Sequence, residues 1–155
     1  MHRTMFASDK ISKESDIIAP LGTAAVCRIN RRRIKMDNKQ IVLDFYEHVF
    51  NNWDISYVDA HMKDDYKQHS AGVKDGKEGF MEFITEFVKK EPHADVVKAI
   101  AEDNLVCMFF KCSFKDGTVA KVFDLYRLED GKLAEHWDSV MRVDNIEAAS
   151  GNGHF

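Results

Sequence analysis

The sequence predicts a single α+β domain in which three helices pack on one face of a curved antiparallel sheet. The 155-residue chain, 45% hydrophobic and 31% charged, is long enough for one domain with a substantial core. Apolar residues recur at helical spacing in the first half of the chain. After Pro92 they alternate as in strands. Helices followed by strands, rather than alternating with them, favour the α+β class.

The first helix is predicted to begin at Asp37, because Asp37-Asn38-Lys39-Gln40 has the pattern of a capping box. Behind it, apolar residues at steps of one, three and four form one stripe: Ile41, Val42, Phe45, Tyr46, Val49 and Phe50. Asn51-Asn52 ends this helix. Asp54 can cap a short second helix over about residues 55–63.

The third helix follows a short extended stretch at residues 66–70. It begins at Asp75-Gly76-Lys77-Glu78, which repeats the capping-box pattern. Its apolar face carries Phe80, Phe83, Ile84, Phe87 and Val88. Glu91-Pro92 ends the helix, because proline has no amide hydrogen and disfavours helical backbone at the residue before it.

Four strands are predicted in the second half, over residues 95–101, 105–115, 119–128 and 133–143. The turns between them contain Glu102-Asp103-Asn104, the hairpin dipeptide Asp116-Gly117, and Glu129-Asp130-Gly131-Lys132. Short turns at regular spacing predict an antiparallel meander.

The composition changes near Met36. Residues 1–35 carry 8 Lys/Arg and 3 Asp/Glu, whereas the remainder carries 14 and 23. Phe6 is the only aromatic residue before Met36, and 16 follow it. A segment so poor in aromatic residues contributes little to a core. We therefore expect three parts: a flexible basic extension over 1–35, a folded domain over 36–145 and a disordered tail over 146–155.

Several alternatives compete for the first 35 residues. A secretory signal fits poorly, because the apolar run is interrupted by Pro20 and Gly22 and follows acidic residues. The Ser/Lys/Arg content suits an organelle transit peptide, but the same acidic residues count against it. Arg31-Arg32-Arg33 would suit an arm that contacts nucleic acid or a membrane surface. We favour a disordered extension, or a biological start at Met36.

The remaining composition excludes several function classes. A net charge of −4 argues against a general nucleic-acid binder, and no apolar run is long enough to cross a bilayer. The three cysteines form no C-x-x-C pair. Cys107 and Cys112 are five apart in a predicted strand and so point to opposite faces. We interpret them as free buried thiols of a cytoplasmic protein.

The hairpin over residues 119–143 carries ionisable residues that do not fit a plain core. Alternation places Asp124 on one face with Val122, while His136 and Asp138 share a face on the next strand. Regular pairing across the turn brings Asp124 near Asp138, and a slip of one residue would exchange the faces. Two carboxylates with apolar walls raise each other's proton affinity, which makes a carboxylate useful as an acid or base.

Two alternatives stay open for these residues. They can be the solvent-facing set of an alternating strand, or an internal His–Asp hydrogen bond that only stabilises the fold. His69, His136 and Asp138 could also be metal ligands, but no recognised ligand motif such as H-E-x-x-H occurs. We therefore predict no metal site.

Three segments together resemble the SnoaL-like proteins, a branch of the nuclear transport factor 2-like superfamily. They are Tyr66-Lys67-Gln68-His69, the helix start Asp75-Gly76-Lys77-Glu78-Gly79-Phe80, and the hairpin from Val122 to Asp138. The resemblance covers about residues 37–144. It implies a cone-shaped barrel, a bent sheet wrapped around helices, with a deep pocket and a homodimer formed through the sheet.

The resemblance also implies a function. The superfamily includes polyketide cyclases, which close rings by intramolecular aldol reactions, ketosteroid isomerases, and members that only bind ligands. By this resemblance Asp138 is the pocket base, with Asp124 across the hairpin, and His136 or His69 polarises the substrate oxygen. No cofactor is implied, and the substrate is a small apolar carbonyl compound. The aromatic residues expected to bind it are Tyr66, Trp137, Tyr126, Phe83 and Phe110.

Overall fold

The computed structural model describes residues 37–155, and the predictions made for residues 1–35 lie outside them. The three predicted helices are confirmed. They are α2 (Asn38–Tyr46), which continues as a π-helical turn η1 (Glu47–Asn51), α3 (Tyr57–His61), and α4 (Gly76–Phe87), which ends in a 3₁₀ turn η2 (Val88–Lys90).

Five strands form one sheet in the order β1-β5-β4-β3-β2. The predicted meander comprises β2 (His93–Glu102), β3 (Leu105–Ser113), β4 (Val119–Glu129) and β5 (Lys132–Arg142), all paired antiparallel. The stretch read only as extended is a further strand, β1 (Met62–Gln68), which pairs parallel with β5. An irregularity in the register between Met62 and Lys67 lets β1 end with Gln68 opposite His136.

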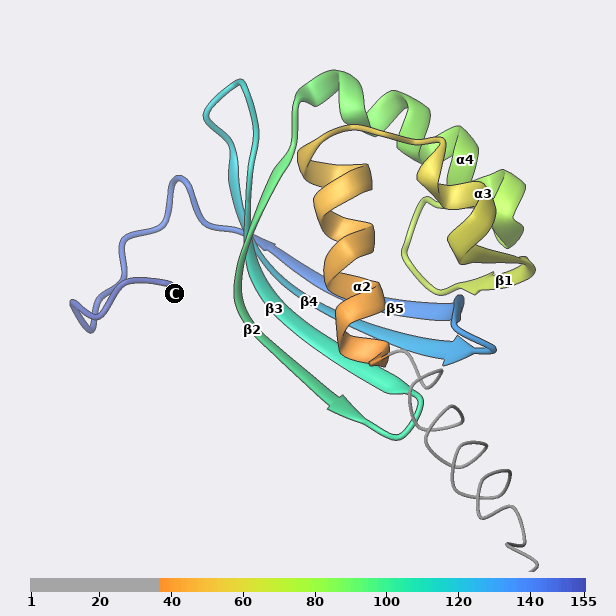
Figure 1. The fold of residues 1–155 in the computed structure, drawn as a ribbon. Coiled ribbons are helices and arrows are strands. Elements are labelled where there is room, and N and C mark those ends of the chain that lie inside the picture. Colours follow the sequence, from red (N-terminus) through yellow and green to blue (C-terminus); the bar gives the residue numbers. More distant parts are fainter. Residues whose placement is uncertain (1–36) are drawn as a thin grey trace, which may run out of the picture. The chain divides into compact units, whose positions relative to one another are not determined.

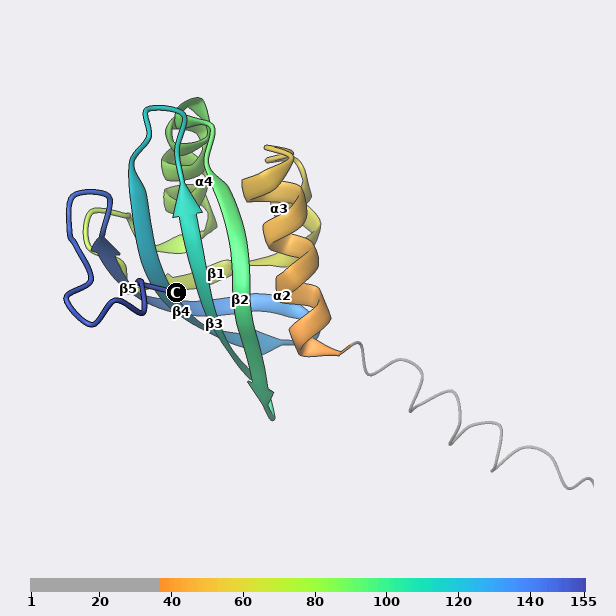
Figure 2. The ribbon, with the colours of Figure 1, turned by 90° about the vertical axis from the view of Figure 1, so that its left-hand side faces the viewer.

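The sheet is strongly curved, and α2 lies along its concave face beside α4 (Figure 1). A view turned by 90° shows the long strands bending along their length (Figure 2). The mixed α+β architecture agrees with the predicted cone fold. The sheet does not close into a barrel, because β1 and β2 form two separate edges of the described sheet.

The core lies between the concave face of the sheet and the helices. Phe45 on α2 is fully buried, and its ring centroid lies 6.0 Å from that of Phe80 on α4. Tyr66 on β1 packs edge-on against Phe80 at 5.9 Å. Each such side chain stabilises the fold by about 1.5–3 kcal/mol on burial, so the apolar stripes read from the sequence fix the helices on this face.

The two predicted capping boxes behave differently. The Asp37 side chain accepts a hydrogen bond from the Lys39 amide, as an N-cap should. Asp75 occupies the N-cap position of α4 but makes no side-chain cap bond. Its carboxylate instead accepts the Gln68 amide at 2.9 Å. Asp75 therefore ties the start of α4 to the end of β1.

The convex face of the sheet leaves apolar side chains exposed. The Phe109 and Phe123 rings stack there at 4.5 Å, and Phe123 is 47% exposed. Residues after β5 form no helix or strand, and the Phe155 ring lies 6.2 Å from that of Phe109. The homodimer predicted through the sheet stays a prediction.

The two cysteines of β3 do point to opposite faces. Cys112 is buried on the concave side, but Cys107 is exposed. The interpretation of Cys107 as a buried thiol was therefore wrong, because no helix or strand of residues 37–155 covers the convex face of β3 at this position. Among the helices of residues 37–155, none has both the length and the apolar character of a membrane span.

Candidate active site

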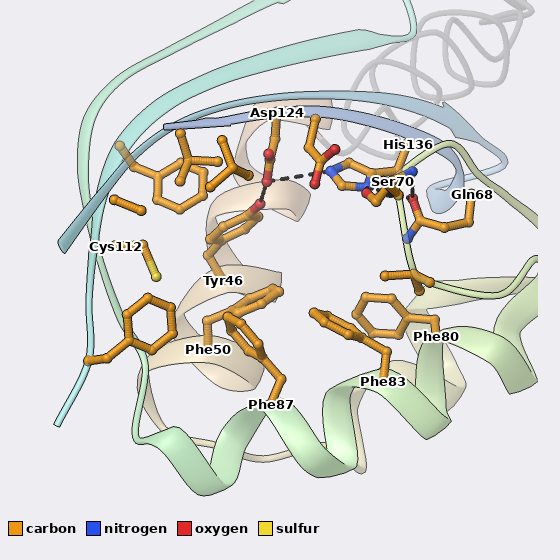
Figure 3. A pocket seen from close by; sticks show the side chains of 18 of the residues that line it. Tyr46, Phe50, Gln68, Ser70, Phe80, Phe83, Phe87, Cys112, Asp124 and His136 are labelled. Atoms are coloured by element: carbon orange, nitrogen blue, oxygen red, sulfur yellow. Dashed lines mark hydrogen bonds and ion pairs between the residues drawn. The ribbon is translucent and has the colours of Figure 1, made fainter. Parts of the chain in front are cut away.

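A pocket of about 350 Å³ lies between the concave sheet face and the helices. One of its sides is polar and carries Asp124, His136, Gln68 and Ser70. The opposite side carries aromatic rings from α4 and η1, namely Phe80, Phe83, Phe87 and Phe50 (Figure 3). An apolar cavity with a few convergent polar groups is the usual form of a small-molecule site.

The Asp124 carboxylate is buried on β4 at 6% exposure. The hydroxyl of Tyr46, at the end of α2, donates a hydrogen bond to Asp124 Oδ2, and the Tyr46 and Tyr126 hydroxyls lie 3.0 Å apart. Because the Tyr46 proton points to the carboxylate, Tyr126 donates to the Tyr46 oxygen. A chain of two phenols therefore stabilises one buried carboxylate.

His136 faces the same carboxylate from β5. Its Nε2 lies 3.5 Å from Asp124 Oδ2, and its ring stacks on Tyr126 with centroids 4.4 Å apart. On the other side of the ring, Nδ1 lies 2.9 Å from Gln68 Oε1. His136 is 7% exposed, so both ring nitrogens depend on protein or ligand groups rather than on bulk water.

Three buried polar atoms around this cluster have no hydrogen-bond partner among the described residues: Asp124 Oδ1, His136 Nε2 and Tyr66 Oη. Leaving such atoms unpaired costs about 1–3 kcal/mol each. Two of the three belong to residues that line the pocket. The site therefore offers hydrogen-bonding capacity to a bound molecule.

Burial dominates the acidity of the three tyrosines. It raises the pKa of Tyr46 and of Tyr126 well above the usual value, and the charge of Asp124 raises both further. Burial also raises the pKa of Tyr66, helped by the charges of Asp124 and Asp138. All three phenols stay protonated at neutral pH, and Tyr46 and Tyr126 act as hydrogen-bond donors.

Asp138 lines the pocket from β5, opposite Asp124 in the antiparallel register. The two residues do lie opposite each other, as predicted, but the pairing across the turn is not regular, because the register shifts by one residue between Arg127 and Leu128. Unlike Asp124, Asp138 is exposed. The predicted ionisable residues of the hairpin thus divide into a buried pair, Asp124 and His136, and a carboxylate that water reaches.

The aromatic residues expected to bind substrate lie in different places. Tyr126, Phe83 and Phe110 line the pocket. Tyr66 is 1% exposed and packed in the core, outside the set of lining residues. Trp137 does not line the pocket either, because it is adjacent to His136 in the strand and points to the opposite face.

His69 also lies away from the pocket. Its Nε2 is 3.0 Å from Glu135 Oε1, and its ring stacks on Trp137 with centroids 4.8 Å apart. Glu135 in turn accepts Arg127 Nε at 2.8 Å. His69 therefore belongs to a charged cluster on the other face of β5 and cannot join His136 and Asp138 as a third metal ligand. Among residues 37–155, no group of three or more His, Cys, Asp or Glu side chains has a metal-binding arrangement.

Sequence reasoning missed Tyr46 and Gln68. Tyr46 falls in the apolar stripe of its helix, where a tyrosine looks like any core aromatic residue. A buried phenol needs a polar partner, which is the signal that could have singled it out. Gln68 was part of a quoted motif, but its contact with His136 depends on the parallel pairing of β1 with β5.

A comparison with protein families matches residues 40–145 to the family described as SnoaL-like polyketide cyclase. Among curated proteins the sequence has no significant match.

Solved structures share the fold. TsrD from Streptomyces laurentii superposes with a TM-score of 0.59 at 18% identity, covering 68% of this chain and 91% of that one. An NTF2-like protein of unknown function from Cytophaga hutchinsonii gives 0.60 at 20% identity, covering 69% and 92%. IdmH from Streptomyces antibioticus, a proposed polyketide cyclase, gives 0.56 at 17% identity, covering 68% and 92%. At these identities the likeness establishes the fold.

Proposed function

The chain belongs to the SnoaL-like polyketide cyclase family, and we propose that it is a cofactor-independent acid–base enzyme acting on a small, largely apolar carbonyl compound. The observation that supports this most is the buried Asp124–His136 pair on the polar side of an otherwise aromatic pocket. Unpaired atoms of that pair, Asp124 Oδ1 and His136 Nε2, suit a ligand with one polar group on an apolar body.

In the proposed reaction, Asp138 removes a proton from the carbon next to the substrate carbonyl. The C–H electron pair becomes the C=C bond of the enolate, the π pair of the carbonyl moves to its oxygen, and the proton forms an O–H bond on Asp138. His136 Nε2, in its protonated form, donates to the developing oxyanion, where a fixed donor in a dry site is most effective. The buried Asp124 balances the charge of His136. His69 has no role here, because it lies outside the pocket.

The enolate can then react in two ways. Attack of the enolate carbon on a second carbonyl of the same substrate forms a carbon–carbon bond and an alkoxide, which takes the proton back from Asp138; this is aldol cyclisation. Return of the proton from Asp138 to a different carbon gives isomerisation. Both routes restore the carboxylate and need no oxidant, reductant or co-reactant. The aromatic side of the pocket would hold the apolar body of the substrate.

A non-catalytic ligand-binding domain is the second candidate. The exposure of Asp138 favours it, because water that reaches this carboxylate competes with a substrate for contact with it. Deuterium exchange separates the candidates without knowledge of the product. Carbonyl compounds that bind are incubated with the protein in D₂O, and exchange at the carbon next to the carbonyl is followed by proton NMR.

The enzyme hypothesis expects exchange with the wild type and a loss of about 10²–10⁴-fold in Asp138→Asn with binding retained. Asp130→Asn, an exposed change on the turn of the same hairpin, is the control. Binding without exchange across the panel would support the binding domain. An unchanged exchange rate in Asp138→Asn would refute the assigned base.

A further inference from the structure

Gln68 lies where β1 meets the polar side of the pocket. Parallel pairing with β5 places it opposite His136, and its amide lines the pocket beside the imidazole (Figure 3). None of the roles assigned above requires Gln68. Its contacts nevertheless determine which nitrogen of His136 carries a proton.

The Gln68 Oε1 atom has three neighbours at hydrogen-bond distance: the Ser70 amide at 3.1 Å, the Ser70 hydroxyl at 3.0 Å and His136 Nδ1 at 2.9 Å. A backbone amide can only donate, so the atom it meets must be the carbonyl oxygen of the side chain rather than its NH₂ group. An oxygen of this kind can only accept. The Ser70 hydroxyl lies 3.4 Å from Nδ1, but it directs its own hydrogen to Gln68 Oε1 at the shorter distance of 3.0 Å. Nδ1, at 2.9 Å from the same oxygen, is therefore assigned a hydrogen that it donates to Gln68.

The opposite ring nitrogen has a different environment. Nε2 of His136 lies 3.5 Å from Asp124 Oδ2 and has no hydrogen-bond partner among residues 37–155. With Nδ1 donating to Gln68, Nε2 is the ring nitrogen of His136 that is left to exchange a proton with a bound molecule. This nitrogen faces the Asp124 carboxylate.

We propose that Gln68 is a positioning residue that fixes His136 in the Nδ1–H tautomer, so that Nε2 alone exchanges a proton in the pocket. This proposal deepens the proposed function. It rests on that function only in one respect, namely that the proton on Nε2 is donated to the oxygen of the substrate. The fixed tautomer itself follows from the contacts of Gln68.

Nitrogen-15 NMR of the full chain tests the tautomer directly, because a bare ring nitrogen resonates far downfield of one that carries hydrogen. The resonances of His136 are assigned by their loss in His136→Gln. In neutral His136 we expect hydrogen on Nδ1 and a bare Nε2. The reverse pattern, which prevails in free histidine, would overturn the proposal.

Two substitutions test the part played by Gln68. Gln68→Leu removes the acceptor, and we expect His136 to shift toward the Nε2–H tautomer. Gln68→Glu keeps an acceptor oxygen and should restore Nδ1–H. Gln40→Leu, the same change at an exposed position on α2, is the matched control and should leave the His136 signals in place.

An unchanged tautomer in a folded Gln68→Leu protein would refute the role of Gln68. If that variant does not fold, Gln68→Glu decides: retention of Nδ1–H supports the proposal, and its loss overturns it. These signals need no substrate. Absence of deuterium exchange on every carbonyl compound would therefore remove the proposed function while leaving the tautomer result unaffected.

Discussion

The hydroxyl of Tyr46, in the last turn of α2, donates a hydrogen bond to the carboxylate of Asp124 on β4, 78 residues further along the chain. This contact joins the helical layer to the sheet at the polar side of the pocket. Both groups are buried, so water cannot replace either partner. The bond therefore affects the stability of the fold as well as the geometry of the site.

We expect Tyr46→Phe to lower the free energy of unfolding by about 1–3 kcal/mol, because it removes a donor from a buried carboxylate. Tyr126→Phe is the matched control. Its hydroxyl bonds to a neutral phenol, so the expected loss is about 0.5–1.5 kcal/mol. Urea denaturation of both variants measures the difference. A larger loss in Tyr126→Phe would contradict this assignment of donors.

Stability should fall steeply above pH 10. Burial raises the pKa of Tyr46, Tyr66 and Tyr126 in the folded protein, whereas in the unfolded chain they titrate near the usual value of about 10. Above that pH the unfolded state binds fewer protons than the folded state. The contribution of these tyrosines to the free energy of unfolding is therefore fully present below about pH 10 and is lost as the pH rises further. The limiting slope is about 4 kcal/mol per pH unit for three phenols.

Denaturation curves between pH 8 and 11 check this slope, and Tyr126→Phe should reduce it by about one third. Phenolate absorbance of the native protein should report chiefly Tyr57, the one tyrosine of the chain's four that is not among these three. Early titration of all four in the folded state would mean that the three core phenols are not buried.

Gly79→Ala should disturb both the fold and the pocket. A Cβ at this buried position on α4 would clash with the backbone oxygen of Lys74, which cannot move without the loop that carries it. Overpacking of this kind costs about 1–3 kcal/mol. The same loop supplies Ser70, Ala71 and Val73 to the pocket.

Thermal unfolding and ligand titration measure the two effects of Gly79→Ala. Glu86→Ala, an exposed change on the same helix, is the control and should alter neither. A Gly79→Ala protein with unchanged stability and affinity would show that the loop shifts freely.

The predicted homodimer can be tested on the convex face of the sheet. Phe123 is exposed there and stacks on Phe109. If a second copy covers this face, Phe123→Lys places a charge in the interface and should yield monomers by light scattering coupled to size-exclusion chromatography. Thr85→Lys, on the exposed side of α4, should leave the mass unchanged. A wild-type protein that is already monomeric would rule out the dimer.

The sequence was most informative where a pattern has a single period. Helical stripes located α2 and α4, and the Asp54 cap located the short helix between them. The turn Glu129–Lys132 located the hairpin, but a register shift between Arg127 and Leu128 is what brings Asp124 opposite Asp138. Alternation also placed Trp137 on the face opposite His136. Its aromatic character nevertheless suggested a binding role, which the geometry of a strand does not allow.

The remaining features depend on contacts between distant segments. No local sequence pattern predicts that β1 joins the sheet parallel to β5, since the residues of β1 are mostly polar. Gln68 reaches His136 through that pairing, whereas His69, the next residue, reaches the cluster of Glu135. One position along the chain thus separates a pocket residue from a surface one.

The pocket has the sheet on one side and the helices on the other, with consequences for any molecule bound inside. Such a molecule would contact both layers at once, and its binding to the folded state would raise the free energy of unfolding. At a free concentration of one hundred times its Kd, the molecule would raise the free energy of unfolding by about 2.7 kcal/mol. Melting temperature alone can therefore rank a library of compounds before any reaction has been observed.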